Sequence, residues 1–309
     1  MSADTTSPGE QPAVRSGFVA LVGRPNAGKS TLVNAVVGTK VAITSDTPQT
    51  TRHRLRAVVD TEDAQIVLVD TPGLHKPHDA LGESLNRSGL MALSDVDVAC
   101  LVIDGSAQVG KGDRWVAEQV AASRAAKVLV LTKVDLVDQA RVERQLESAR
   151  TLMEYDDEVA VSAVEGFNVD GFVGTVTRLL PEGPRYFPRD MATDQPLEVM
   201  VAEFIREKVL RSTFDEVPHA VGVAVDELEY VSASDLARVT ATVFVERESQ
   251  KGIIVGRGGE MIKRIGSEAR VDLERLLGSR VYLDLIVKVK RNWRRDASQI
   301  RRFGYGEGL

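Results

Sequence analysis

The sequence predicts two domains, an α/β domain built on a mostly parallel sheet and a smaller α+β domain that follows it. From residue 16 to residue 180, apolar runs alternate with amphipathic stretches, which is typical of parallel strands joined by helices. The proline-rich stretch 181–196 ends this alternation, so it is predicted to be a linker. In the remainder, 197–309, β-rich segments lie between helical ones. A chain of 309 residues is long enough for two domains of ordinary size.

The composition is that of an ordinary globular protein, with 43% hydrophobic and 27% charged residues. Cys100 is the one cysteine, which excludes an internal disulfide, and its apolar surroundings favour a buried thiol over a reactive one. No apolar run approaches the roughly 18 residues of a membrane span, and the N-terminus lacks a signal sequence. We therefore expect a cytoplasmic protein.

The α/β domain is predicted to begin after a tail, because residues 1–15 offer almost nothing to bury and should be disordered. Its strands are predicted at 17–22, 54–60, 65–70, 96–103, 127–132 and 158–162. Its helices are predicted near 29–37, 82–94, 111–124, 138–153 and 168–180. This order predicts a mostly parallel sheet covered by crossover helices.

The second domain is predicted to begin with an amphipathic helix at 197–214, in which Val201, Ile205 and Val209 recur at helical spacing. The elements predicted after it are β-rich stretches at 219–230 and 237–248, the apolar stretch 253–255, a glycine loop, a helix at 260–277, a strand at 281–289 and a basic helix at 292–303. This mixed order predicts an α+β fold.

The segment 23–30 reads Gly-Arg-Pro-Asn-Ala-Gly-Lys-Ser and lies between a predicted strand and a predicted helix. That spacing in that setting is typical of a phosphate-binding loop and disfavours a mere glycine-rich turn. The loop N–H groups and the helix N-terminus would contact phosphate oxygens. Lys29 would reach the β- and γ-phosphates, and the Ser30 hydroxyl would bind Mg²⁺.

A second phosphate-contacting segment, Asp70-Thr71-Pro72-Gly73, follows the strand predicted at 65–70. An aspartate there can hold Mg²⁺ through water, and the Gly73 N–H can contact a γ-phosphate. The alternative is a simple Pro-Gly turn after a strand. The phosphate loop earlier in the chain favours the nucleotide interpretation.

Thr132-Lys133-Val134-Asp135 follows the strand predicted at 127–132 and indicates a guanine pocket. The Asp135 carboxylate can accept hydrogen bonds from N1–H and the 2-amino group of guanine, a donor pair that adenine lacks. Ser162 and Ala163 would close the pocket with an N–H near guanine O6. Lys133 and Asp135 therefore disfavour an ATP-dependent kinase, which could use the same phosphate loop.

Together these segments resemble the translation-factor class of G proteins. Within it, Gln49–His53 (Gln-Thr-Thr-Arg-His) and Asp70–His75 (Asp-Thr-Pro-Gly-Leu-His) resemble the Era family. The resemblance covers about residues 16 to 306 and implies a P-loop GTPase domain followed by a KH domain of the type II-like kind. It also implies that Thr50 or Thr51 contacts Mg²⁺ and the γ-phosphate in the GTP state. We expect Thr51, with Thr50 as the alternative.

The resemblance implies catalytic roles for Lys29, Thr51 and Gly73, and Mg²⁺ contacts from Ser30, Thr51 and Asp70. The implied nucleotide contacts are Gly23, Arg24, Pro25, Asn26, Ala27, Gly28, Lys29, Ser30, Thr31, Asp70, Thr71, Pro72, Gly73, Leu74, Thr132, Lys133, Val134, Asp135, Ser162 and Ala163.

Three positions bear on affinity and rate. Thr132 replaces the family's usual asparagine, which ties the base loop to the phosphate loop and contacts guanine N7, so we expect weaker guanine affinity. Leu74 stands where many GTPases have a water-orienting glutamine; we expect it to pack, and unassisted hydrolysis to be slow. Related G proteins with Pro-Asn in the loop hold K⁺ with that asparagine. Asn26 therefore either contributes to a K⁺ site or only shapes the loop.

The segment 254–262 places Gly-x-x-Gly between an apolar stretch and a helix. It resembles the loop of a KH domain, which clamps about four nucleotides of RNA; the alternative is a glycine loop that only begins a helix. Residues 251–302 hold 14 Lys and Arg against 6 Asp and Glu, a charge of +8, while the remainder carries −14. The candidate RNA contacts are Gly256, Arg257, Gly258, Gly259, Lys263 and Arg264. Basic residues around Trp293 provide either further phosphate contacts and a stacking face or a plain solvated helix.

The Era resemblance implies a GTP-hydrolysing switch that binds the 3′ end of 16S rRNA and acts in assembly of the 30S subunit. GTP would order residues near 44–53 and 71–80, with Mg²⁺ as cofactor. The implied partners are GTP, GDP, 16S rRNA and the 30S precursor, and the implied state is a monomer with weak peripheral association at the inner face of the cell membrane. The alternatives are a signalling G protein with a protein-binding second domain, or another ribosome-assembly or tRNA-modifying G protein.

Overall fold

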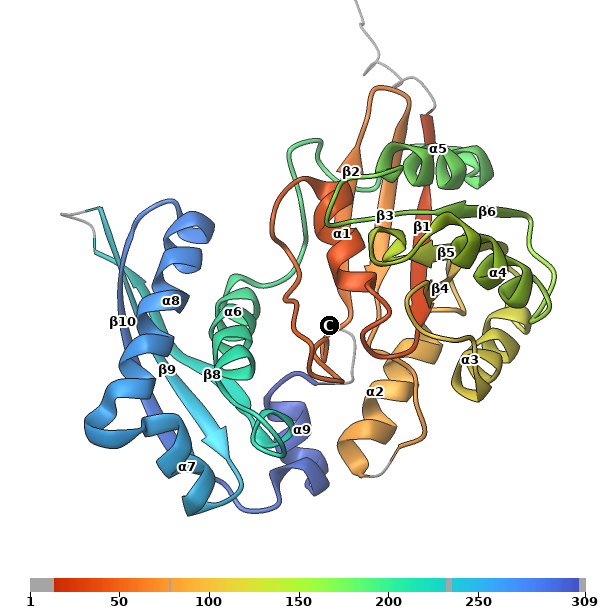
Figure 1. Cartoon of the computed structure of the whole chain (residues 1–309). Coiled ribbons are helices and arrows are strands. Elements are labelled where there is room, and N and C mark those ends of the chain that lie inside the picture. The colour runs from red at the N-terminus through yellow and green to blue at the C-terminus, as the bar shows by residue number, and fades with distance from the viewer. Residues whose placement is uncertain (1–13, 78, 232–234, 306–309) are drawn as a thin grey trace, which may run out of the picture.

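The computed structural model describes residues 14–77, 79–231 and 235–305, which form two domains with separate sheets (Figure 1). The predicted tail lies outside the described residues as far as residue 13. Its last two residues differ from the prediction, because Val14 and Arg15 already belong to the first strand. Val14 is buried, and the Arg15 guanidinium donates to the Leu180 carbonyl at 2.6 Å.

The sheet of the first domain is mostly parallel, as predicted. Its strands are β1 (Val14–Gly23), β2 (Leu55–Asp60), β3 (Ala64–Asp70), β4 (Val98–Asp104), β5 (Ala126–Thr132), β6 (Asp157–Ala160) and β7 (Glu182–Gly183). Their order is β2-β3-β1-β4-β5-β6, with β7 paired to β1. β2 is antiparallel to β3 and β7 to β1, and the other pairs are parallel.

Helices cover both faces of this sheet, which explains why its central strands read as continuous apolar runs. The helices are α1 (Lys29–Val37), α2 (Ala80–Met91), α3 (Lys111–Ala121), α4 (Gln139–Arg150) and α5 (Val169–Leu179). α1 and α5 contribute Leu32 and Phe172 to one core, which also contains the predicted buried Cys100. α3 contributes Val116 to the core on the other face. The loops that follow β1, β3 and β5 therefore meet at one sheet edge.

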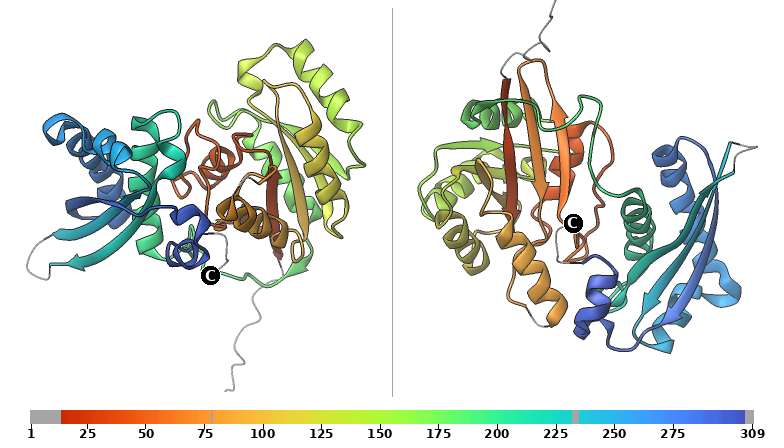
Figure 2. Two further views of the ribbon diagram at one scale, coloured as in Figure 1. Left: turned by 90° about the horizontal axis from the view of Figure 1, so that it is seen from below. Right: turned by 180° about the vertical axis from the view of Figure 1, so that it is seen from behind.

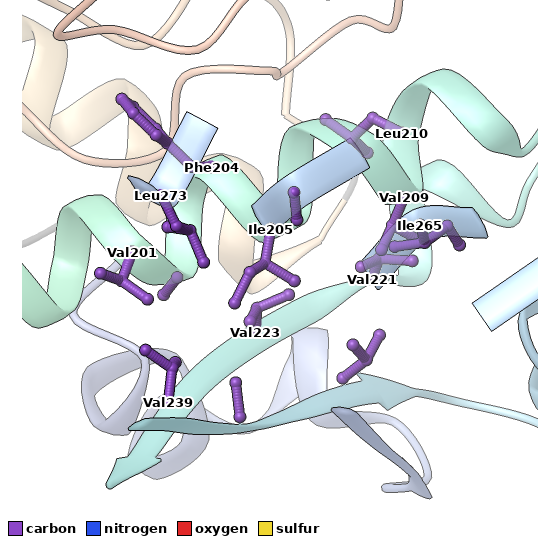
Figure 3. Close-up of a cluster of buried hydrophobic side chains, with 14 of the residues drawn as sticks. Val201, Phe204, Ile205, Val209, Leu210, Val221, Val223, Val239, Ile265 and Leu273 are labelled. Atoms are coloured by element: carbon purple, nitrogen blue, oxygen red, sulfur yellow. The ribbon is translucent and has the colours of Figure 1, made fainter. Parts of the chain in front are cut away.

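The second domain has the α-β-β-α-α-β order of a KH fold, followed by a short C-terminal helix. Its elements are α6 (Leu197–Ser212), β8 (Gly222–Tyr230), β9 (Leu236–Val245), α7 (Glu248–Val255), α8 (Glu260–Leu277), β10 (Arg280–Val289) and α9 (Ala297–Arg302). The central strand β9 runs antiparallel to β8 and parallel to β10. In Figure 3, Ile205 of α6, Val223 of β8 and Leu273 of α8 point into one core between helices and sheet.

The C-terminal segment differs from the single basic helix predicted at 292–303. A 3₁₀ turn (Trp293–Arg295) ends at Asp296, whose carboxylate caps α9 by accepting from Ser298 N at 2.9 Å. Aspartate favours this capping position over a helix interior, which explains the break. Trp293 is fully buried, and its indole N–H donates to the Ala220 carbonyl. The hypothesis of a stacking face at Trp293 is therefore wrong.

The two domains share a small apolar core. Leu81 and Leu85 of α2 pack with aromatic residues near the C-terminus, among them Trp293, Phe303 and Tyr305. Figure 2 shows α9 beside α2, and α6 facing the segment that connects α1 to β2. This segment, residues 38–54, is called the switch segment below.

Candidate nucleotide site and RNA interface

The loops at the sheet edge enclose a cavity of about 420 Å³. The lining residues that the sequence predicted are Pro25, Asn26, Gly28, Lys29, Ser30, Thr31, Thr51, Gly73 and Lys133. Gly73 has to be glycine here, because a Cβ would lie 2.5 Å from Pro25 N. The segment after β3 and the phosphate loop can therefore meet over the same space, as a γ-phosphate contact requires.

Other lining residues were not among the predicted nucleotide contacts, although Thr50 was named as the alternative to Thr51. They are Ile43, Thr44, Ser45, Asp46, Gln49, Thr50, Val164 and Arg211. Most lie in the switch segment, whose path depends on tertiary packing and not on a local motif. Arg211 comes from α6 of the second domain, so a motif search within the first domain could not find it.

Lys29 is placed for phosphate binding. Its Nζ donates to the carbonyls of Gly23 at 3.1 Å and Arg24 at 2.9 Å, and the side chain is buried. Burial lowers the pKa of Lys29 to about 8, although the nearby Asp70 carboxylate acts in the opposite direction. Anionic phosphates at the ammonium group would favour its charged form and raise this pKa again.

Three oxygen groups form a cluster suited to Mg²⁺. Ser30 Oγ lies 2.6 Å from an Asp70 carboxylate oxygen and 2.8 Å from Thr51 Oγ1. The Thr50 hydroxyl instead lies 2.7 Å from Ser45 Oγ. Thr51, and not Thr50, is therefore the threonine beside Ser30 and Asp70.

The chemistry of this cluster fits Mg²⁺, which prefers oxygen ligands. The second Asp70 carboxylate oxygen is buried and has no hydrogen-bond partner among the described residues. Burial raises the pKa of Asp70, while Lys29 opposes the rise; a bound cation would favour the charged form. No group of three or more His, Cys, Asp and Glu side chains in the described part of the chain could hold a metal alone. Phosphate oxygens would have to complete the ligand set.

The base-reading segment is connected to the phosphate loop through Thr132. Its Oγ1 lies 2.7 Å from the Ala27 carbonyl and 3.0 Å from the Ile103 carbonyl. The Lys133 ammonium pairs with Asp104 at 2.7 Å. Asp135 is exposed, and its carboxylate makes no ion pair or hydrogen bond within the described residues. It is therefore accessible to a base.

Several predicted contacts lie outside the cavity lining. They are Gly23, Arg24, Ala27, Asp70, Thr71, Pro72, Leu74, Thr132, Val134, Asp135, Ser162 and Ala163. The Leu74 side chain packs in the core, and its N–H donates to the Gly23 carbonyl at 3.1 Å. The predicted packing of the Leu74 side chain is therefore confirmed, and a nucleotide contact from Leu74 stays a prediction. Arg24 turns toward Asp113, at 3.2 Å, and Thr71 donates to the Leu21 carbonyl.

The candidate RNA loop joins α7 to α8. Gly256, Gly258 and Gly259 adopt φ values of +73°, +60° and +84°, a region that favours glycine. Arg257 and Lys263 are exposed and form no ion pair among the residues described. The loop therefore presents a backbone of small residues flanked by cationic side chains.

Arg294, another basic residue at the C-terminal end, is less available. Arg294, beside the buried Trp293, pairs with Glu246 at 2.8 Å and with Asp79 at 3.4 Å. Its charge is used in contacts within and between the domains, so it is a weaker candidate for phosphate binding than Arg257.

The α/β fold, the phosphate loop and the oxygen cluster define a P-loop GTPase, and the second domain is a KH domain. A family model described as a 50S ribosome-binding GTPase matches residues 18–133, and a KH-domain model matches residues 216–294. Two solved structures are similar over nearly the whole chain. One is a point variant of Aquifex aeolicus Era bound to GDP and AlF4⁻, and the other is Era with MgGDPNP and nucleotides 1506–1542 of 16S ribosomal RNA.

Each of these structures is 37% identical, covers 96% of this chain and 100% of its own, and has a TM-score of 0.92. The chain belongs to the Era family. It is a GTPase that carries a C-terminal KH domain. None of the helices within the described ranges has the length and apolar character needed to span a membrane.

Proposed function

We propose that this GTPase binds the 3′ end of 16S rRNA through its KH loop and acts as a nucleotide-dependent switch in assembly of the 30S subunit. The observation that carries the proposal is the match in fold, along 96% of the chain, to an Era structure that holds MgGDPNP and 16S rRNA nucleotides. The glycine loop at 256–259 and its exposed cations supply the chemistry for contact with a single-stranded backbone. The protein would act as a monomer in the cytoplasm, with at most weak peripheral association with the membrane.

We assign the nucleotide contacts as follows. Lys29 and the loop N–H groups bind the phosphates, and Gly73 N–H faces the γ-phosphate. Ser30, Thr51 and Asp70 would hold Mg²⁺, which neutralises charge on the β- and γ-phosphates. Asp135 would read the base, and Ser162 and Ala163 would close the pocket around it. Since Leu74 is buried, other groups must orient the attacking water.

The switch would work through loss of the γ-phosphate. With GTP bound, Thr51 and Gly73 hold residues near 44–53 and 71–80, and hydrolysis releases them. The switch segment packs against α6, so this release alters how the KH domain is presented.

Potassium should accelerate hydrolysis if Asn26 contributes to a cation site beside the phosphates. Asn26 lines the cavity, and its side-chain amide donates to the Asp46 carbonyl at 2.6 Å, which joins the phosphate loop to the switch segment. A cation there would stabilise the negative charge of the transition state, as an arginine finger does in other GTPases. An arginine finger raises their hydrolysis rate by about 10³–10⁵. We expect kcat in KCl to exceed kcat in NaCl by at least about tenfold. Equal rates would remove Asn26 from the mechanism.

The identity of the RNA tests the proposed function. Protein purified with GDPNP and with GDP should retain RNA whose sequences concentrate at the 3′ end of 16S rRNA, in amounts that depend on the nucleotide. Retention of other RNA, or of partner proteins without RNA, would favour a different assembly factor or a signalling G protein.

A further inference from the structure

The switch segment is held by the second domain along its length. The Thr44 N–H donates to Glu207 of α6 at 2.9 Å, and Arg211 donates to the Thr44 carbonyl at 3.1 Å. Lys40 pairs with Glu207 and, at 2.6 Å, with Asp272 of α8. The conformation of the switch segment is therefore determined by both domains.

The contact nearest the magnesium site is made by Arg206, a fully buried residue of α6. Its guanidinium donates to the backbone carbonyl of Thr50, the residue before Thr51. Glu203, one turn earlier, fixes the guanidinium through a second pair of contacts, with Nε 2.7 Å from Oε1. Burial raises the pKa of Glu203, but the Arg206 charge outweighs this and holds that pKa below its usual range. The pair is therefore ionised at neutral pH.

The residue after Thr51 is held from the same side. Arg52 is 1% exposed and donates to the carbonyls of His219, at 3.1 Å, and Val221. Its guanidinium also lies over the rings of Trp293 and Tyr305, at 5.6 and 5.2 Å from their centroids. Both chain neighbours of Thr51 are thus fixed by the second domain, while the Thr51 hydroxyl stays beside Ser30.

We propose that Arg206 is a positioning residue for GTP hydrolysis. By holding the Thr50 carbonyl it presents the Thr51 hydroxyl to Mg²⁺ and the γ-phosphate, so the KH domain completes the GTPase site. Ordering the switch segment costs conformational entropy. Because the buried contacts with Arg206 are made before GTP binds, that cost does not add to the barrier for hydrolysis. The inference rests on the proposed placement of Thr51 at the magnesium site.

Arg206→Lys in the full-length protein tests this role. Lysine keeps a positive charge opposite Glu203 but lacks the planar fork that reaches both Glu203 and the Thr50 carbonyl. We expect kcat and affinity for Mg·GDPNP each to fall by about tenfold, the loss of one charge-assisted hydrogen bond. Affinity for GDP should stay within about twofold, because GDP lacks the γ-phosphate that Thr51 contacts. Single-turnover hydrolysis and nucleotide titrations measure these values.

Ile265→Val is the control, because it removes one methyl from the KH core without touching the switch segment. It should lower the melting temperature and leave kcat unchanged. If Arg206→Lys does not fold, Glu203→Gln replaces it; this variant frees the guanidinium and should shift kcat in the same direction. A folded variant with unchanged kcat and an unchanged ratio of GDPNP to GDP affinity would overturn the inference, as would an equal loss for both nucleotides.

The Thr51→Ala variant distinguishes a failure of the role proposed for Arg206 from a failure of the proposed placement of Thr51 at the magnesium site. If Thr51→Ala leaves GDPNP affinity and the Mg²⁺ requirement unchanged, the placement of Thr51 is wrong and the proposed site fails. If Thr51→Ala loses both but Arg206→Lys does not, only the role of Arg206 fails.

Discussion

Asp135→Asn should change the nucleotide preference from guanosine to xanthosine triphosphate. The exposed Asp135 carboxylate belongs to the base-reading segment, which Thr132 connects to the phosphate loop, so it is placed to accept both guanine donors. Hydrogen bonds to charged groups contribute about 1.5–3 kcal/mol each. Replacing this acceptor with an amide should therefore weaken GTP binding by about 10²–10⁴. Xanthine carries an oxygen where guanine has its amino group, and the amide N–H can donate to it.

Competition of GTP and xanthosine triphosphate for a fluorescent nucleotide measures this change. Asp138→Asn is a matched control, since Asp138 is an exposed carboxylate three residues away that caps α4 by accepting from Arg141 N at 2.7 Å. Asparagine caps helices as well as aspartate does, so this variant should bind GTP normally. Unchanged GTP selectivity in Asp135→Asn would remove the assignment of the base pocket.

Replacing Arg257 and Gly258 together with aspartate should abolish binding of single-stranded RNA at micromolar concentrations. Gly258 is exposed with φ +60°, a conformation that aspartate tolerates better than most residues, so the KH fold should persist. The two carboxylates would face the RNA backbone, and loss of close approach and charge should weaken binding by at least about 10². Affinity for GTP should not change. Fluorescence anisotropy with a labelled 3′-end RNA, over a range of salt concentrations, measures the loss.

The chain offers a control with the same change in charge. Arg275 and Gly278 lie at the other end of α8, both exposed, and Gly278 also has a positive φ of +64°. Apart from a general electrostatic effect, aspartate at both positions should change the RNA affinity by no more than about twofold relative to the unmodified protein. If the two double variants lose affinity equally, the Gly-x-x-Gly loop is not the RNA site.

The sequence predicts the architecture well where local pattern and tertiary environment agree. β3 is buried along its whole length, as its apolar run predicts for a strand covered on both faces. The phosphate loop is a local motif, and its setting between β1 and α1 is confirmed. At the C-terminal end the pattern and the environment disagree. The basic stretch around Trp293 has the composition of a surface helix, but this side chain is buried where the two domains meet.

The rest of the site could not be derived from the sequence because it depends on contacts between distant segments. Thr50 and Thr51 are adjacent and chemically identical, and only the path of the switch segment distinguishes them. Arg206 lies 156 positions from the carbonyl that it holds. In the sequence it is one charged residue of an amphipathic helix, for which a solvent-exposed place is the usual expectation.

The central claim is that the switch segment couples the nucleotide to the KH domain, and the affinity of the RNA in two nucleotide states tests it most directly. A labelled 3′-end RNA would be titrated with protein loaded with GDPNP and with GDP, at equal Mg²⁺ and salt. Coupling between two sites is typically about 1–3 kcal/mol, so the account predicts dissociation constants that differ by at least about fivefold. Equal dissociation constants in the two states would contradict it.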